Sequence, residues 1–278
     1  DYDGNPTYYY RGSVENNYVK FAGYYWRIIR INSNGSIRMI YDGTSAHSDG
    51  EVSEDRQYGT SQFNSSYNDN MYVGYMYTSG EPHGTGTSSA IKNNIDKFYT
   101  DKLVSYTSKL DMNAGFCGDR SNLNLQSGVG TGNVVTYNKG YLRVEKSTPT
   151  LICENINDYY TLTSTTNGNK KLTYPIGLIT VDETMLAGHA GGIFDGMHNE
   201  MKINKTSYLT TGHVFYTMTS PGGYNPYDFT FWYASVFTVN IVGGFDDEAT
   251  NYNYGLRPVI NIRSDVTITG SGTMSDPY

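Results

Sequence analysis

The chain has 278 residues, 28 of them Tyr, and a formal net charge of −7. Tyrosine therefore supplies much of the apolar surface, and its hydroxyl suits it to boundaries between core and water. The acidic balance argues against a nucleic-acid partner or an anionic membrane surface, because both require a basic face and no Lys/Arg cluster supplies one.

No apolar run approaches the roughly 18 to 20 residues that span a bilayer, and no signal peptide opens the sequence. Because the sequence begins without Met, we expect a trimmed, mature ectodomain of an exported protein, with any anchor outside it. The length suits one large domain or two small ones. No segment has the character of a domain linker, so we expect a single domain over 1–278.

The first part of the chain predicts β-structure. Residues Tyr8 to Asp42 contain two apolar runs around Asn34-Gly35, the strongest two-residue hairpin signal. Residues Gly43 to Gly86 are rich in Ser, Gly, Asn and Tyr, and they predict a long irregular excursion. The apolar segment MYVGYMY at 71–77 is expected to form one short strand within it.

Two segments predict helices. Residues Ser88 to Leu110 carry apolar residues on one helical stripe, with a serine at the start as N-cap and a break expected near Tyr99-Thr100. The segment Thr173 to Thr180 predicts a buried lead into the second helix, which has Thr180 as N-cap and Gly188 as its stop. From Tyr208 onward the pattern returns to strands, so the expected class is α+β.

The sequence contains two cysteines, Cys117 and Cys153, in a loop-rich region. One interpretation is two buried free thiols. The other is a disulfide that closes a loop of about 37 residues and stabilises the fold by roughly 3 to 4 kcal/mol. We predict the disulfide, since it suits an exported protein with this Tyr-, Asn-, Gly-, Ser- and Thr-rich composition.

A search for catalytic or cofactor chemistry finds no nucleophile elbow, zinc-protease motif, P-loop or dinucleotide fingerprint. The histidines at 189, 198 and 213 lie close in sequence, but a Gly-rich segment gives them no framework that fixes ligand geometry. The acidic triplet Asp246, Asp247 and Glu248 is interpreted as a solvated loop, with cation binding as the alternative. We expect no cofactor, no metal and no enzymatic activity.

The stretch Tyr224 to Asn253 differs in composition from its surroundings. It is crowded with Tyr, Phe, Asn, Asp, Ser and Thr and contains no Lys or Arg, whereas its flanks, Val214 to Pro221 and Tyr254 to Ile262, have the pattern of buried strands. Evolved binding loops use such a composition, because Tyr and Trp give large rigid contact areas and Ser and Asn add adaptable hydrogen bonds. The alternative is an ordinary Tyr-rich hairpin.

FYTMTSP, the aromatic stretch and YGLRPVINI together resemble the variable region of diversity-generating retroelement proteins. The chain resembles a group of type IV pilin-like surface proteins of gut Firmicutes, and segments such as AIKNNIDKFY, GFCGDR and LICENINDYYTLT extend the resemblance along nearly the whole chain. The resemblance implies a C-type lectin fold of the formylglycine-generating-enzyme type, with two helices, antiparallel strands, long irregular loops and a variable ligand-binding region within 214–262.

In that family, adenine mutagenesis acts mostly on AAY codons, which cannot then encode Lys, Glu, Gln, Met or Trp. Between residues 224 and 253 only Trp232 and Glu248 fall outside the reachable set. The resemblance therefore implies that these two are fixed framework, together with the inward-facing Ala234, Val236 and Val239. Trp232 is also expected to contact ligand.

The remaining candidates are implied to be varied and exposed, and to bind ligand. They are Tyr224, Asn225, Tyr227, Asp228, Phe229, Thr230, Phe231, Tyr233, Phe237, Asn240, Phe245, Asp246, Asp247, Tyr252 and Asn253.

The chain lacks the sugar-binding signatures of calcium-dependent lectins, the catalytic Cys pair of formylglycine-generating enzymes and the pilin helix, so none of those activities is implied. The expected function is a cell-surface adhesion module, displayed on a pilus or a membrane anchor. Its partner would be a protein or glycan on a cell or phage surface. The alternative is a structural pilin-like subunit that uses the Tyr-rich stretch to pack against other subunits.

Overall fold

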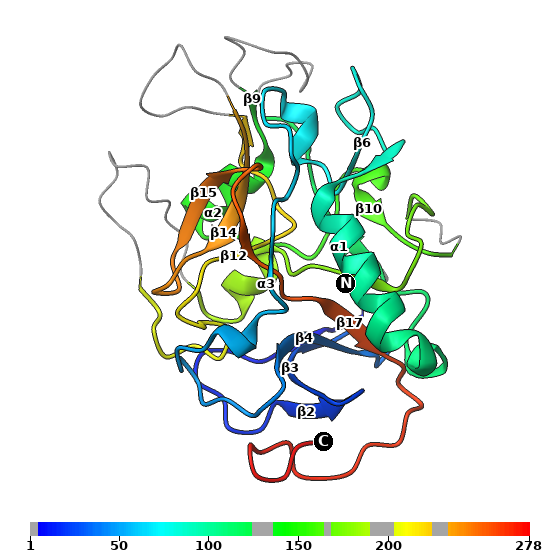
Figure 1. Ribbon diagram of the computed structural model, residues 1–278, viewed down its shortest axis with the longest axis vertical. Helices are drawn as coiled ribbons and strands as arrows, with labels where there is room; N and C mark the ends of the chain where they lie inside the picture. The colour runs from blue at the N-terminus through cyan, green and yellow to red at the C-terminus, as the bar shows by residue number, and fades with distance from the viewer. Residues whose placement is uncertain (1–4, 124–135, 164–167, 190–202, 224–232) are drawn as a thin grey trace.

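The computed structural model describes residues 5–123, 136–163, 168–189, 203–223 and 233–278 (Figure 1). Two larger sheets and two short two-stranded ladders are arranged with three α-helices in these residues. All strand pairs are antiparallel except β12 with β16. The α+β class is confirmed.

The first sheet has the order β1-β3-β4-β17-β11, with β2 paired to β3. Its strands are β1 (Tyr8–Tyr9), β2 (Tyr18–Phe21), β3 (Tyr24–Ile31), β4 (Ile37–Gly43), β11 (Ile176–Gly177) and β17 (Val259–Ile262).

The second sheet has the order β5-β16-β12-β14-β13-β9, with β15 paired to β14. Its strands are β5 (Thr60–Ser61), β9 (Thr136–Tyr137), β12 (Phe215–Tyr216), β13 (Gly222–Gly223), β14 (Ala234–Val239), β15 (Phe245–Ala249) and β16 (Tyr254–Gly255).

The hairpin expected around Asn34-Gly35 joins β3 to β4, so that prediction is confirmed, although the connection is longer than two residues. Ile31 pairs with Ile37, which leaves residues 32–36 in the loop. The Asn34 side chain accepts a hydrogen bond from the Ser36 amide at 3.0 Å, and Gly35 has a φ of +80°. A side-chain hydrogen bond and a residue that tolerates positive φ therefore close the turn.

The two predicted helices are present. Helix α1 (Ala90–Phe98) begins at the N-cap Ser89 and continues as a π-helical turn, Tyr99–Leu103, and a 3₁₀ helix, Val104–Lys109. The break therefore falls at Tyr99, as expected. Helix α3 (Val181–Leu186) begins with a capping box between Thr180 and Glu183.

A third helix, α2 (Lys139–Lys146), was not predicted, so the expected number of two helices is wrong. It is only eight residues long and contains Gly140, and Val144 is its one buried large apolar side chain. The strand expected at 71–77 is also mostly wrong: a 3₁₀ helix covers Asn70–Val73, and only β6 (Met76–Tyr77) pairs, with β7 (Thr87–Ser88).

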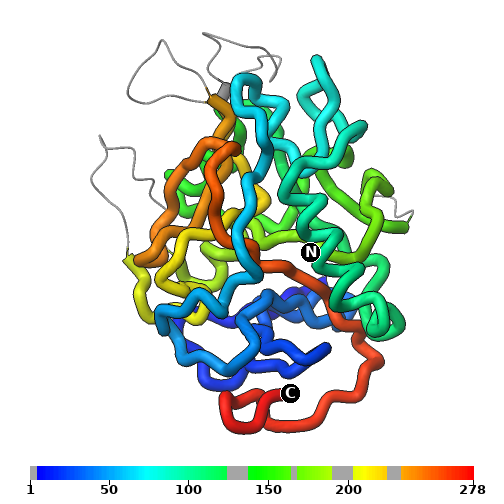
Figure 2. Tube along the Cα trace, viewed as in Figure 1, coloured from blue at the N-terminus to red at the C-terminus, as the bar shows by residue number. Residues whose placement is uncertain are grey.

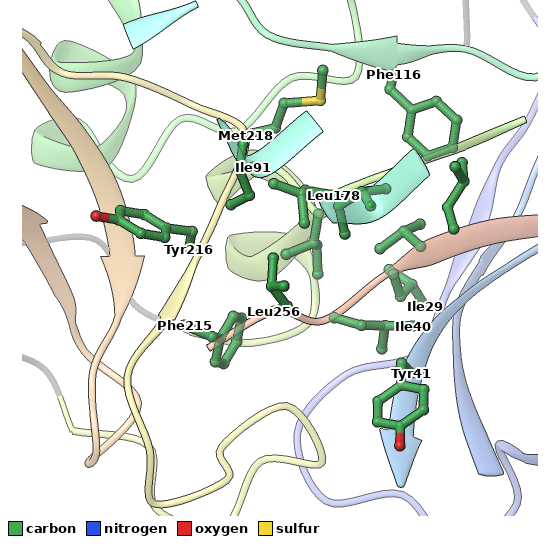
Figure 3. Close-up of a cluster of buried hydrophobic side chains, with 14 of the residues drawn as sticks. Ile29, Ile40, Tyr41, Ile91, Phe116, Leu178, Phe215, Tyr216, Met218 and Leu256 are labelled. Atoms are coloured by element: carbon green, nitrogen blue, oxygen red, sulfur yellow. The ribbon is translucent and has the colours of Figure 1, made fainter. Parts of the chain in front are cut away.

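The hydrophobic core joins the two sheets and α1 (Figure 3). Ile29 and Ile40 enter it from β3 and β4, Ile91 from α1, and Phe215 and Tyr216 from β12. All five side chains are buried. Both sheets and the first helix therefore contribute side chains to one continuous hydrophobic cluster.

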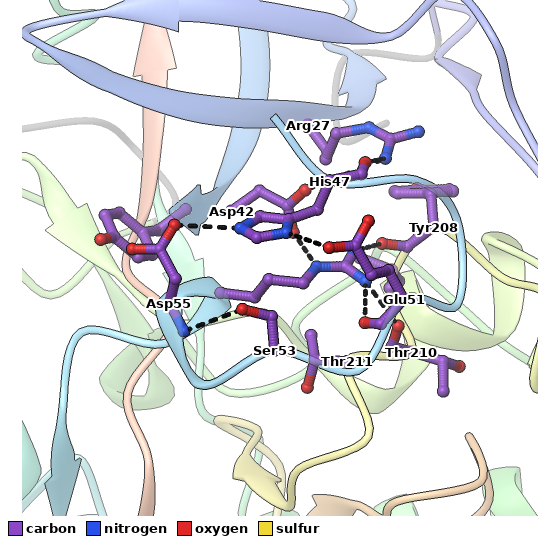
Figure 4. A network of polar contacts seen from close by, with 12 residues as sticks. Arg27, Asp42, His47, Glu51, Ser53, Asp55, Tyr208, Thr210 and Thr211 are labelled. Atoms are coloured by element: carbon purple, nitrogen blue, oxygen red, sulfur yellow. Dashed lines mark hydrogen bonds and ion pairs between the residues drawn. The ribbon is translucent and has the colours of Figure 1, made fainter. Parts of the chain in front are cut away.

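A buried ionic cluster also connects distant parts of the chain (Figure 4). Asp42 Oδ1 accepts from Arg56 Nε at 2.9 Å and from Arg257 Nη2 at 2.8 Å, and Arg27 Nη1 lies 3.9 Å from the other oxygen. Arg56 also donates to the Tyr208 and Thr210 carbonyls. One carboxylate therefore joins guanidinium groups from three separate segments, all buried, and Arg27 has a second carboxylate partner in Asp49 at 2.6 Å.

The predicted disulfide between Cys117 and Cys153 is confirmed, with Cα atoms 5.6 Å apart. Cys117 lies in β8 (Phe116–Cys117), which pairs with β10 (Tyr159–Tyr160). The bond fastens the segment after α2 to this ladder. Among the described residues, no helix has the length and apolar character needed to cross a membrane.

The last residues of the chain run beside β2, as the red and blue ends show in Figure 2. The Lys20 amide donates to the Tyr278 carbonyl at 2.9 Å, and the Tyr278 amide donates to the Tyr18 carbonyl at 3.0 Å. The Tyr18 amide donates to the Gly272 carbonyl at 2.8 Å. These bonds cover the outer edge of β2.

Candidate ligand-binding surface

The described part of the candidate region is built on β14 and its edge partner β15 (Figure 1). The two strands pair from Ser235 opposite Ala249 to Val239 opposite Phe245. All six residues of β14 are buried. The inward positions expected for Ala234, Val236 and Val239 are therefore confirmed, since each has no exposed surface.

The exposure expected of three candidates in this region is wrong. Phe237 and Phe245 are fully buried and pack together with ring centroids 6.5 Å apart. Asn240 is 6% exposed, and its Oδ1 accepts from the amides of Val242 and Gly244. Sequence composition could not separate these residues from their neighbours, because Phe and Asn also serve as core and turn residues.

Other candidates do lie at the surface. Tyr252 is 53% exposed, Asn253 is exposed, and Tyr233 is half-buried. The Tyr216 hydroxyl fixes the base of this surface, because its one proton is shared between the carbonyls of Ala249 and Tyr252, each 3.0 Å away. The exposed ring of Tyr252 therefore lies on a turn whose backbone is anchored by the buried Tyr216.

The acidic triplet lies on β15 rather than in a solvated loop, so the loop interpretation is wrong. Asp246, Asp247 and Glu248 are all half-buried. Partial burial raises the pKa of Asp246 and of Glu248, and the hydrogen bond from Tyr254 to Glu248 opposes that rise. Asp246 Oδ2 accepts from Asn240 Nδ2 at 3.2 Å.

Tyr67 belongs to the same surface, although no sequence pattern predicts it there. Its carbonyl accepts from the Ala234 amide at 2.6 Å, and its side chain is 45% exposed. The neighbouring Ser66 carbonyl accepts from Thr250 Oγ1 at 2.9 Å, so this segment lies across the ends of β14 and β15. Only a long-range contact places Tyr67 here, and its Ser- and Asn-rich sequence has no periodicity that predicts it.

Eight predicted ligand-binding residues lie outside the described residues. They are Tyr224, Asn225, Tyr227, Asp228, Phe229, Thr230, Phe231 and Trp232.

Of the histidines considered for a metal site, His189 and His213 lie within the described residues. His189 is buried, with Nδ1 2.7 Å from the Gly243 carbonyl and Nε2 2.8 Å from Ser207 Oγ. Burial lowers its pKa to about 4, which favours a neutral ring that donates through Nδ1 and accepts from the serine. His198 lies outside the described residues. Within the described ranges, no group of three or more His, Cys, Asp or Glu residues is arranged to hold a metal ion.

No protein-family model, curated protein or solved structure matches the chain. Its function must therefore be argued from its own residues.

Proposed function

We propose that this chain is a non-enzymatic, surface-displayed binding module on a C-type lectin-like scaffold, with its ligand site in the stretch 224–253. The proposal follows the resemblance to retroelement-diversified proteins. The observation that supports it best is the contrast between the wholly buried strand β14 and the neighbouring tyrosine- and acid-bearing surface. A rigid strand beside exposed aromatic side chains is the arrangement that a binding site with variable residues requires.

The aromatic-acidic surface comprises the partly or fully exposed residues Tyr67, Tyr233, Asp246, Asp247, Glu248, Tyr252, Asn253 and Tyr254.

The chemistry of this surface favours certain partners. It holds tyrosine rings and carboxylates, and the stretch 224–253 contains no Lys or Arg. Tyrosine anchors bury a large area at low entropic cost, and carboxylates accept hydrogen bonds and attract cations. A partner rich in hydrogen-bond donors or positive charge fits best. The disulfide is consistent with an extracellular location.

The diversification proposal is tested by sequencing the gene from many strains of one population. We expect amino-acid changes to concentrate at Asn-templated codons of the stretch 224–253 and to spare Phe237 and Phe245, which the core requires. Mostly synonymous substitutions, spread evenly along the gene, would refute the diversification proposal.

Binding is tested separately on protein and glycan arrays. For a partner that the native chain captures, Tyr252→Ala is expected to weaken binding by about tenfold or more. Tyr8→Ala is the matched control, because Tyr8 is 65% exposed on the other sheet and should leave binding unchanged. Equal loss in both variants would contradict the placement of the site. Unchanged array binding together with failure of pilus assembly in Tyr252→Ala would favour the structural-subunit alternative.

A further inference from the structure

A polar cavity of about 270 Å³ lies away from the aromatic-acidic surface and shares no residue with it. Its wall comes from β3, β4 and the loop between them, from the segment around Asp111, from α2 and α3, and from the disulfide region at Cys117. The lining is dominated by Arg, Asn, Asp, Glu and Thr side chains, with one aromatic ring, Tyr159. Such a lining suits a ligand with many hydrogen-bonding groups rather than an apolar one.

Three of the four carboxylates that line the cavity are neutralised by the arginines beside them. Glu183 pairs with Arg30 at 3.0 Å and also with Arg38. Arg143 bridges Asp119 at 2.8 Å and Asp182 at 2.7 Å. These guanidinium groups and carboxylates form a fixed, charge-balanced frame.

The fourth lining carboxylate, Asp111, has no guanidinium or ammonium within ion-pair distance among the described residues. It is 7% exposed, and its partners are the neutral donors Asn34 Nδ2 and the Asn113 amide, both at 2.9 Å. Arg263, which Asp111 influences through space, is itself paired with Asp265. The cavity therefore contains one buried negative charge without a cationic partner.

Two amides beside Asp111 also have unused hydrogen-bonding groups. The Asp111 amide donates to the Asn261 carbonyl at 2.8 Å, which places Asn261 at the same end of the cavity. Asn32 Nδ2 donates to Asn261 Oδ1 at 3.0 Å, and this leaves Asn32 Oδ1 and Asn261 Nδ2 buried without a hydrogen-bond partner. Turning both amides over exchanges these atoms but still leaves one donor and one acceptor.

A buried carboxylate without a cationic partner is costly, so Asp111 defines the charge that a ligand in the cavity must supply. The ligand needs a cationic donor for Asp111 and hydroxyl-like groups that both donate and accept for the other polar side chains of the lining. The cavity volume equals roughly nine water molecules in the liquid, which admits a ligand of about a dozen bonded non-hydrogen atoms.

We propose that this cavity is a second binding site, for a small polyhydroxylated amine of the size of one amino sugar. The ammonium group binds Asp111, and hydroxyl groups bind the other polar side chains that line the cavity. The site goes beyond the proposed adhesive surface, because none of its residues lies in the stretch 224–253.

The test compares three sugars of one shape and different charge by ligand-observed NMR and calorimetry: glucosamine, glucose and glucuronate. The protonated amine is expected to bind about tenfold more tightly than glucose, since a hydrogen bond between charged groups is lost in the neutral sugar. Glucuronate is expected to bind least. Equal binding of all three, or no binding of glucosamine, would overturn the proposal.

Two variants locate the site. Asp111→Asn should reduce the preference for glucosamine over glucose to less than about twofold. Ala114→Leu places a larger side chain in the lining without removing any of the hydrogen bonds described above, and it should weaken all three sugars together. The second variant keeps the test valid if loss of the Asp111 charge disturbs folding, which urea unfolding of each variant will show.

Asp101→Asn is the matched control, because it makes the same chemical change at a surface ion pair with Lys97 outside the cavity. It should retain the full preference for glucosamine. A preference that survives Asp111→Asn, or that disappears in Tyr252→Ala instead, would place binding elsewhere and refute this site. Since the two sites share no residue, failure here leaves the adhesive function to its own test.

Discussion

Arg257 Nη2 lies 2.8 Å from Asp42 Oδ1, although the two residues are 215 positions apart in the chain. Arg257 also donates to the Leu209 and Tyr41 carbonyls, and burial lowers its pKa to about 9. The pair connects the segment between β16 and β17 to the end of β4. It therefore joins the scaffold of the aromatic-acidic surface to the first sheet.

Replacing Asp42 with Asn should destabilise the fold strongly. The substitution leaves the buried Arg56 and Arg257 without a carboxylate partner, whereas Arg27 keeps Asp49 at 2.6 Å. Breaking a buried ion pair in this way costs about 3 to 5 kcal/mol. Urea unfolding followed by fluorescence measures the loss. Asp265→Asn is the control, since its pair with Arg263 is at the surface, where solvent screens it, and its loss should change stability far less. Similar losses in the two variants would contradict the role assigned to Asp42.

Stability should fall as pH is lowered from about 6.5 to about 4, in part because of His189. The His189 pKa is about 4 in the folded chain and 6.5 in the unfolded chain. Between these pH values the unfolded chain binds a proton that the folded chain does not bind. The His189 contribution to the free energy of unfolding should decrease by about 3 kcal/mol by pH 4 and then level off.

His189→Asn removes this dependence and is compared with the native chain at each pH. The comparison is needed because the raised pKa values of Asp246 and Glu248 act in the opposite direction and stabilise the fold as pH falls. Parallel stability curves for the variant and the native chain between pH 7 and pH 5 would show that His189 does not cause the effect.

Loss of the disulfide should lower the free energy of unfolding by about 3 to 4 kcal/mol, since Cys117 and Cys153 are 36 positions apart and the bond restricts the unfolded chain. The double variant Cys117→Ser/Cys153→Ser and the reduced native protein should lose similar amounts in urea unfolding. A reductant should have no effect on the double variant. An effect there would point to a cause other than this bond.

Phe237→Ala and Tyr252→Ala should separate framework from surface. The first removes a fully buried ring from β14 and is expected to cost about 3 to 5 kcal/mol, whereas the second changes an exposed ring and should alter stability by about 0.5 kcal/mol or less. Thermal and urea unfolding measure both. Equal stability of the two variants would be inconsistent with the burial of Phe237.

The elements that the sequence predicted correctly are those with local physical signals. Thr180 and Glu183 form the capping box that begins α3, and Asn34 with Gly35 closes the β3–β4 turn. Helix α2 was missed because Gly140 and its mostly polar residues give no clear apolar stripe. A resemblance to a known family supplied the C-type lectin-like fold, which stays a prediction.

The candidate site was less predictable because exposure depends on contacts between distant residues. Phe245 and Tyr252 have similar aromatic character and are seven positions apart, yet one is buried between strands and the other is exposed on a turn. The hydrogen bond from the Ala234 amide to the Tyr67 carbonyl places Tyr67 at the same surface as Tyr252, and no local sequence pattern predicts this contact. The Asp111 cavity likewise depends on a side-chain arrangement that no motif encodes.

The bonds from Tyr278 and Gly272 to β2 also bear on how copies of this protein behave at high concentration. An uncovered edge strand is a template on which a strand of another molecule can pair, and such pairing leads to aggregation. Here the chain's own last residues occupy that position through Tyr18 and Lys20. They cover the edge of the sheet, so aggregation through β2 would first require these residues to dissociate from that strand.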